Sequence, residues 1–114
     1  MDLKSSSLSL SDDYSKLYEN LAFLHLRRKS SEVYYFKEKQ EVDLYVRTDR
    51  EYLVNVSYAI EDEKTLKREI NALKEGMRYF KLDRAYLVTA ERDERIEVDE
   101  GMIEVVPMWK WLLQ

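Results

Sequence analysis

The sequence YYFKEKQEVDLYV at residues 34–46, followed by YLVNVSY at residues 52–58, decides the fold of this chain. Aromatic and β-branched residues dominate both segments, and short polar connections interrupt them. The pattern predicts strands at Val33–Lys37, Glu41–Arg47 and Tyr52–Ser57. Connections this short cannot carry a crossover, so the strands are predicted to form an antiparallel meander.

One acidic residue, Asp43, lies at the start of the second predicted strand, in a run that otherwise suits a buried sheet. Burying a bare carboxylate is costly, so Asp43 must be solvated, hydrogen-bonded or bound to a metal ion. A structural alternative is that Asp43 ends the preceding turn by hydrogen-bonding to the backbone. The function of the chain depends on what surrounds this residue.

A first helix is predicted from Asp13 to Lys29, because the residues at 11–13 are Ser-Asp-Asp, which cap a helix well and suit its first turn. Residues 1–10 are expected to form an N-terminal lead, either disordered or a short edge strand. The expected apolar face of this helix consists of Leu17, Leu21, Leu24 and Leu26, broadened by Ala22 and Phe23.

A second helix is predicted at Glu63–Phe80, where acidic residues precede a clear amphipathic pattern. Its apolar stripe consists of Leu66, Ile70, Leu73, Met77 and Phe80. The charged residues, Glu69 among them, are expected on the other faces. Gly76 in the interior weakens the helix by about 1 kcal/mol relative to alanine, and we expect it to allow close packing on the sheet.

The rest of the chain completes the sheet. Arg84–Thr89 is predicted to be a strand parallel to the third, because it follows a crossover helix. Arg95–Val98 and Met102–Val106 are predicted to form a hairpin, and Met108–Leu113 a short closing helix. The order predicts an α/β fold, with a mixed central sheet flanked by helices on both faces, in a single domain at residues 11–114.

Composition excludes several classes of protein. The 114 residues contain no cysteine, which removes disulfides, zinc fingers and thiol catalysis and suits the reducing cytoplasm. No apolar run approaches the roughly 18 residues of a membrane span, so no membrane association is expected. A P-loop needs a glycine-rich segment, and the only glycines, Gly76 and Gly101, are far apart. Alone, the chain is not expected to hydrolyse ATP.

Charge argues against a dedicated nucleic-acid coat protein, because the formal net charge is −4. A local basic patch is compatible with that balance. Arg27, Arg28 and Lys29 form a short cationic cluster at the end of the first predicted helix. They are the candidate nucleic-acid-binding residues.

The candidate active site consists of an acidic residue on the first predicted helix, an acidic residue at the start of the second strand and two polar residues on one face of the third strand. These residues are Glu19, Asp43, Asn55 and Ser57. Two carboxylates with a nearby lysine can hold a divalent metal ion and activate water for phosphodiester cleavage.

Several segments together resemble a known type of domain. They are YENLAFLHLRR at 18–28, YYF at 34–36, EVD at 41–43, NVSY at 55–58 and VVPMWKWLL at 105–113. In this order and spacing they resemble the C-terminal domain (the DUF4143 type) of prokaryotic, especially archaeal, P-loop ATPases, which in turn resembles the PD-(D/E)xK nuclease superfamily. The resemblance covers residues 8–114. It implies a restriction-endonuclease-like core and an ATPase partner, or an ATPase domain elsewhere in a longer chain.

Carried over residue by residue, the resemblance makes Glu19 the helical acid and Asp43 the strand acid. In an active member both would hold Mg²⁺ or Mn²⁺. The Glu-x-Lys of active members is replaced here by Asn55 and Ser57. An amide is a weaker metal ligand than a carboxylate, and serine cannot supply the lysine's charge to a transition state. The resemblance therefore implies a degenerate site, with no cofactor expected.

The leading hypothesis is a non-catalytic, nuclease-like accessory domain that serves ATPase-linked interaction, with DNA bound through the basic cluster and the remnant site. Under the structural alternative, Glu19 meets Arg27 or Arg28, and Asn55 and Ser57 only form hydrogen bonds in the core.

Two other hypotheses stay open. One is a metal-dependent nuclease with a rearranged site around Glu19 and Asp43, in which Lys37 or Lys39 takes over the role of the lost lysine. The other is a protein-interaction module, such as a homodimer formed through the aromatic C-terminus. Trp109 and Trp111 are expected there as a core residue and an interface anchor.

Overall fold

The computed structural model describes residues 3–29, 32–38, 41–47, 50–58, 60 and 62–114, with side chains described from residue 16 onward except at 35–38 and 41–43. Its elements are α1 (Leu3–Lys29), β1 (Val33–Glu38), β2 (Glu41–Arg47), β3 (Glu51–Val56), α2 (Glu63–Phe80), β4 (Arg84–Thr89), β5 (Glu94–Val98), β6 (Gly101–Pro107) and α3 (Met108–Leu112).

One six-stranded mixed sheet organises the molecule, in the order β1-β2-β3-β4-β6-β5. β1, β2 and β3 form the predicted antiparallel meander, and β4 runs parallel to β3 as expected after a crossover helix. β5 and β6 form the predicted hairpin, and β6 also pairs in parallel with β4. The three parallel strands β3, β4 and β6 therefore end at the same edge of the sheet, and this edge is referred to below as the carboxyl edge.

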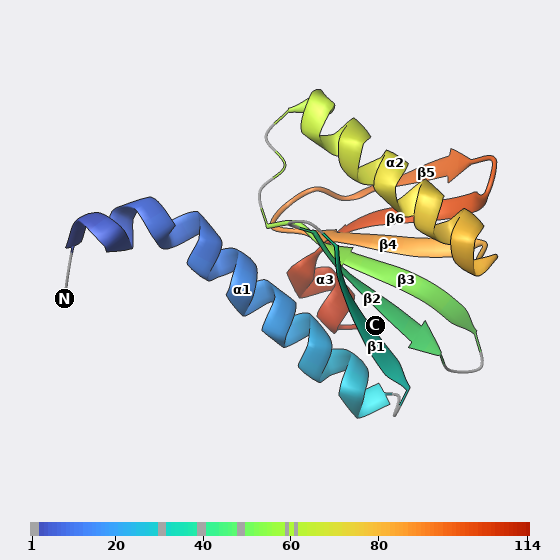
Figure 1. Ribbon diagram of the computed structural model, residues 1–114, viewed down its shortest axis with the longest axis horizontal. Helices are drawn as coiled ribbons and strands as arrows, with labels where there is room; N and C mark the ends of the chain where they lie inside the picture. The colour runs from blue at the N-terminus through green and yellow to red at the C-terminus, as the bar shows by residue number, and fades with distance from the viewer. Residues whose placement is uncertain (1–2, 30–31, 39–40, 48–49, 59, 61) are drawn as a thin grey trace.

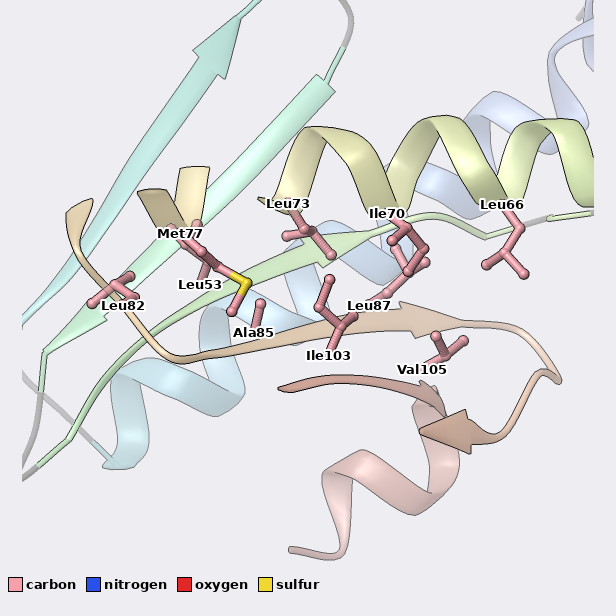
Figure 2. Close-up of a cluster of buried hydrophobic side chains, with 10 residues drawn as sticks. All are labelled: Leu53, Leu66, Ile70, Leu73, Met77, Leu82, Ala85, Leu87, Ile103 and Val105. Carbon is pink, nitrogen blue, oxygen red and sulfur yellow. The ribbon is translucent and has the colours of Figure 1, made fainter. Parts of the chain in front are cut away.

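α2 covers one face of the sheet (Figure 1). Asp62 caps its N-terminus, accepting a 2.7 Å hydrogen bond from the Thr65 backbone through Oδ1. The stripe of α2 packs on side chains from β3, β4 and β6 (Figure 2), and the buried cluster consists of Leu53, Leu66, Ile70, Leu73, Met77, Leu82, Ala85, Leu87, Ile103 and Val105. A Cβ at Gly76 would lie 2.6 Å from Leu53 Cδ1, which confirms that this glycine allows a close approach to the sheet.

α1 and α3 cover the opposite face, where a second core forms. That cluster consists of Ala22, Leu26, Leu44, Val46, Val54, Val88, Val106, Met108 and Trp111. The rings of His25 and Trp111 are 4.9 Å apart and join the two helices. A sheet with helices on both faces is the predicted architecture, and these two clusters confirm it.

The first helix begins earlier than predicted. α1 starts at Leu3, not at Asp13, so residues 3–10 are helical and form neither a disordered lead nor an edge strand. The residues at 11–13 lie inside the helix and do not cap it. The segment contains no glycine or proline to stop the helix, and serine in a helix interior costs little. Although α1 is 27 residues long, neither it nor any other helix in the described part of the chain is long and apolar enough to cross a membrane.

The face of α1 that packs on the sheet also differs from the prediction. Ala22 and Leu26 are buried against the sheet, whereas Leu17, Leu21 and Leu24 are exposed by 48, 37 and 56%. At 3.6 residues per turn the two rows of side chains lie about 150° apart around the helix axis. A single helix on a sheet buries one row, and the row containing the small Ala22 allows the closer approach.

β2 and β4 have the predicted bounds, and the other strands and α3 differ from the prediction by one residue at one or both ends. β1 continues to Glu38, β5 begins at Glu94 and α3 ends at Leu112. β6 ends at Pro107. Both bounds of α2 are as predicted.

Candidate functional site

The strand pairing brings two of the predicted site residues together. In the antiparallel ladder of β2 and β3, Asp43 pairs directly with Asn55. The side chain of Asp43 lies outside the described residues, as do the side chain of Lys37 and the whole of Lys39. The predictions for these three side chains therefore stay predictions.

Asn55 is buried, with 2% of its surface exposed. The preceding residue of β3, Val54, belongs to the core under α1 and α3. In the parallel ladder with β4, Asn55 pairs with Leu87, which belongs to the core under α2. Successive strand residues face opposite sides, so Asn55 belongs to the layer between the sheet and α2. An amide in this layer carries no charge, which makes its burial much less costly than that of a carboxylate.

Ser57 follows the last residue of β3 and continues its parallel ladder. Its backbone N–H donates a 2.8 Å hydrogen bond to the Val88 carbonyl oxygen. The residue is half-buried at the carboxyl edge of the sheet. Its hydroxyl can donate or accept a hydrogen bond, but unlike a lysine it brings no positive charge.

Glu19 is carried by α1, on the opposite face of the sheet from Asn55. The neighbouring residue Tyr18 contacts Tyr58, with ring centroids 5.0 Å apart. This contact places that turn of α1 beside the carboxyl end of β3, near Ser57. Glu19 is half-buried there.

The described side chains at these positions form a poor set of metal donors. Asn55 and Ser57 offer neutral oxygens, whereas Mg²⁺ sites are usually built on one or two carboxylates. Glu19 lies on the far face of the sheet from Asn55. Within the part of the chain whose side chains are described, no three His, Cys, Asp or Glu residues gather in a group that could hold a metal ion. Pairing of Glu19 with Asp43 on a metal stays a prediction.

The basic cluster occupies the last turn of α1, where Arg27, Arg28 and Lys29 are all exposed. Lys29 Nζ donates a hydrogen bond to the Gln114 carbonyl oxygen. Partial burial, together with Lys29 and Arg28, lowers the pKa of His25 below its ordinary value. The cluster is ten residues from Tyr18, about 15 Å along the helix. It therefore does not form one continuous site with Asn55 and Ser57.

A structural role also accounts for the basic cluster. Cationic side chains in the last turn of a helix interact favourably with its partly negative C-terminal end. This interaction is sufficient to explain why three cationic residues occupy the end of α1.

Sequence reasoning missed Glu69, which is buried and not on a solvated face of α2. It lies between Leu66 and Leu73 of the buried stripe, so it faces the sheet from the same side of the helix. Its carboxylate is 3.5 Å from the guanidinium of Arg68, which is mostly exposed. The spacing of three residues from Leu66 is the signal that could have found it. Glu69 adds an acid to the layer that contains Asn55.

A second missed group lies at the carboxyl edge, in the segment after β4. The Arg92 guanidinium contacts the Glu63 carboxylate at 2.7 Å, and this hydrogen bond raises the pKa of Arg92. The Thr89 hydroxyl oxygen accepts a 3.0 Å hydrogen bond from the Arg92 backbone N–H. Arg92 and Glu63 are 29 residues apart along the chain and meet only because β4 ends beside the start of α2. No sequence spacing indicated them.

Two hollows in the described surface are lined by other residues. The larger, of about 650 Å³, is formed by Glu51, Met77, Arg78, Lys81, Leu82, Asp83 and Glu100. The smaller, of about 190 Å³, is formed by Tyr86, Asp93, Glu94, Arg95, Glu104, Val105, Val106, Lys110 and Gln114. Neither contains Glu19, Asn55 or Ser57, so the predicted site residues do not line a pocket in either place.

Comparison with known proteins identifies an archaeal relative. An uncharacterized protein of Methanocaldococcus jannaschii, MJ1544, is 37% identical over an alignment of 118 positions. The alignment covers 94% of the chain but 26% of MJ1544, so the chain spans about a quarter of that protein's length. No protein-family profile matches the chain. No solved structure matches it either.

Proposed function

We propose that this chain is a non-catalytic, nuclease-like accessory domain that acts together with a P-loop ATPase. The observation that carries the proposal is the residue opposite Asp43. At that position the chain has Asn55, buried and uncharged, and two residues later it has Ser57. A site in which an amide and a hydroxyl replace a carboxylate and a lysine lacks the charges that phosphodiester cleavage requires.

The arrangement of the elements supports a restriction-endonuclease-like core. The resemblance implies a mixed central sheet flanked by helices. α1, β1–β3, α2 and β4 build such a sheet, with helices on both of its faces. β5 and β6 would then be additions at one edge of the sheet, and α3 an addition on the face that α1 covers.

An ATPase association rests on the sequence resemblance. The much greater length of MJ1544 is compatible with an accessory domain in a larger protein. The ATPase would be a separate protein or another part of a longer chain. A cytoplasmic location belongs to the same proposal and rests on the absence of cysteine.

The cleavage assay that tests the proposal uses single-stranded, double-stranded and branched DNA with Mg²⁺ or Mn²⁺. We expect the natural chain and its Asp43→Ala variant to leave all three substrates intact, because the charges of a nuclease site are missing. A chain carrying Asn55→Glu and Ser57→Lys tests whether the scaffold can regain activity, and its melting temperature shows whether the buried charge is tolerated. Metal-dependent cleavage by the natural chain that Asp43→Ala abolishes would contradict the proposal.

That contradicting outcome would favour the second candidate, a nuclease with a rearranged site. The next variants would then be Lys37→Ala and Lys39→Ala, since one of these lysines would have to supply the missing charge. Equal cleavage by the natural chain and by Asp43→Ala would indicate a contaminating nuclease, and the assay would be repeated on protein purified by a second route.

DNA binding through the basic cluster is the second part of the proposal, and the exposure of all three side chains supports it. Replacing Arg27, Arg28 and Lys29 with alanine should weaken binding of a fluorescent duplex at least tenfold. The negative slope of the logarithm of the DNA-binding constant against the logarithm of the salt concentration should become shallower by about 0.9 for each phosphate that the variant no longer neutralises. The matched control replaces the exposed residues Lys64, Lys67 and Arg68 of α2 with alanine. Equal weakening by both triple variants would contradict a specific role for the cluster.

A protein-interaction module is the third candidate, and the end of the chain favours it. Trp109 is 64% exposed and Leu113 is 79% exposed. The two residues are four positions apart, about one helical turn. Large apolar side chains at the surface are typical of contact sites between proteins.

A further inference from the structure

α1 has an apolar row that nothing in the described structure covers. Leu17, Leu21 and Leu24 are exposed by 48, 37 and 56% and are spaced by four and then three residues. They lie on the side of α1 turned away from the row that packs on the sheet. Three exposed leucines in one row on one helix are unlike scattered surface leucines, which need no explanation.

The same spacing continues toward the N-terminus of α1. Leucine recurs every seventh residue along the whole helix, at positions 3, 10, 17 and 24. The residues four positions after each of these leucines are Ser7, Tyr14, Leu21 and Arg28, so two of the four are apolar. A repeat of 3.5 residues matches the seam of a two-stranded coiled coil, in which the partner is another α-helix.

The N-terminal part of α1 extends beyond the sheet (Figure 1). The C-terminal part lies on the sheet and carries the exposed leucines. We propose that α1 pairs in antiparallel orientation with α1 of a second copy of this chain. In this pairing Leu17 and Leu21 of each copy cover each other, and the projecting part of each helix covers Leu24 of the other. The contact is the same on both copies, as a two-fold interface requires.

The proposed register places the exposed leucines Leu17 and Leu21 of the two copies against each other. Placing position 17 opposite position 21 of the second copy also places position 14 opposite 24 and position 10 opposite 28. The sheet-facing side chains Ala22 and Leu26 do not take part. The proposed pairing therefore leaves the fold of each copy unchanged.

Charge distinguishes the antiparallel orientation from a parallel one. A parallel pair would place Arg28 against Arg28 of the second copy in the seam, and like charges so close repel. In the antiparallel register these two arginines are separated. The aspartate at position 13 of one copy then flanks the seam on the same side as Arg27 of the other copy. Opposite charges beside the seam favour one orientation over the other.

The first test is the mass of the natural chain in solution, measured by light scattering during gel filtration. A single chain has a mass of 13.8 kDa, and we expect twice that value. The double variant Leu17→Glu and Leu21→Glu should be monomeric, with an unchanged circular dichroism spectrum. The matched control, Trp109→Glu with Leu113→Glu, should remain dimeric, because α3 lies outside the seam. A monomeric natural chain, or a dimer that only the α3 variant dissociates, would overturn the proposal.

The second test determines orientation and uses the absence of native cysteine. Variants Tyr14→Cys and Leu24→Cys are oxidised separately and as a mixture. Antiparallel pairing predicts disulfide-linked dimers that form mainly in the mixture and contain one copy of each variant. Faster linkage of Tyr14→Cys to itself would indicate a parallel pair and overturn the proposed register. Absence of any disulfide linkage would overturn the pairing. The exposed row of leucines would then be a candidate contact for a helix of a different protein.

Discussion

Replacing Trp111 with alanine is expected to lower the free energy of unfolding by about 3–5 kcal/mol, the usual cost of removing a large buried aromatic side chain. Trp111 is 4% exposed and belongs to the core under α1 and α3. Its ring lies 4.9 Å from that of His25. The substitution would leave a cavity where α1, α3 and the sheet meet. Since small domains have about 5–15 kcal/mol of stability in total, the variant should unfold at a much lower urea concentration than the natural chain.

The matched control is Trp109→Ala on the same helix, two residues away. Trp109 is 64% exposed, so its removal should change stability by no more than about 0.5 kcal/mol. Urea denaturation followed by circular dichroism suits both variants, because it does not depend on tryptophan fluorescence. Equal losses for the two variants would show that α3 does not pack on the sheet through Trp111.

Replacing Gly101 with alanine is the second substitution with a large expected effect, a loss of about 3 kcal/mol from backbone strain and overpacking. Gly101 has φ of 151°, in a region that residues with a side chain rarely adopt. An added Cβ would lie 2.6 Å from the Asp83 carbonyl carbon and closer still to its oxygen. That oxygen accepts a 3.0 Å hydrogen bond from the Met102 backbone N–H, so it cannot move away freely.

A fall in melting temperature of roughly 10–20 °C is the expected readout for a domain of this size. Asp99→Ala in the same turn is the control, because Asp99 is exposed and its removal should have little effect. Little change in the Gly101→Ala variant would mean that the β5–β6 turn can rearrange, and that the close approach to Asp83 is not needed for the fold.

The helix α2 shows which structural features the local sequence pattern predicts. Both of its bounds, its buried stripe and the close approach at Gly76 followed from the sequence, because a regular apolar period and an acidic start are local properties. Glu69 was misplaced for the opposite reason. A charged residue was expected in solvent, but its position on the helix, three residues after Leu66, put it in the buried layer.

The candidate site was predictable only in part. The pairing of Asp43 with Asn55 follows from the short connection between β2 and β3, which leaves few registers available. The meeting of Arg92 with Glu63 had no such signal, because it depends on where β4 ends relative to α2. Contacts between segments far apart in the chain are decided by packing.

By itself the sequence determined the order of the elements, the antiparallel meander, the parallel fourth strand and the identities of the residues at the site. Only the tertiary structure decided which side of α1 faces the sheet. Two rows of apolar residues run along that helix, and the prediction from sequence combined them into one buried face. The row containing Ala22 fits against the strands, so the leucines at 17, 21 and 24 stay exposed. Which row is buried depends on the shape of the surface that the helix meets, and that surface exists only once the sheet has formed.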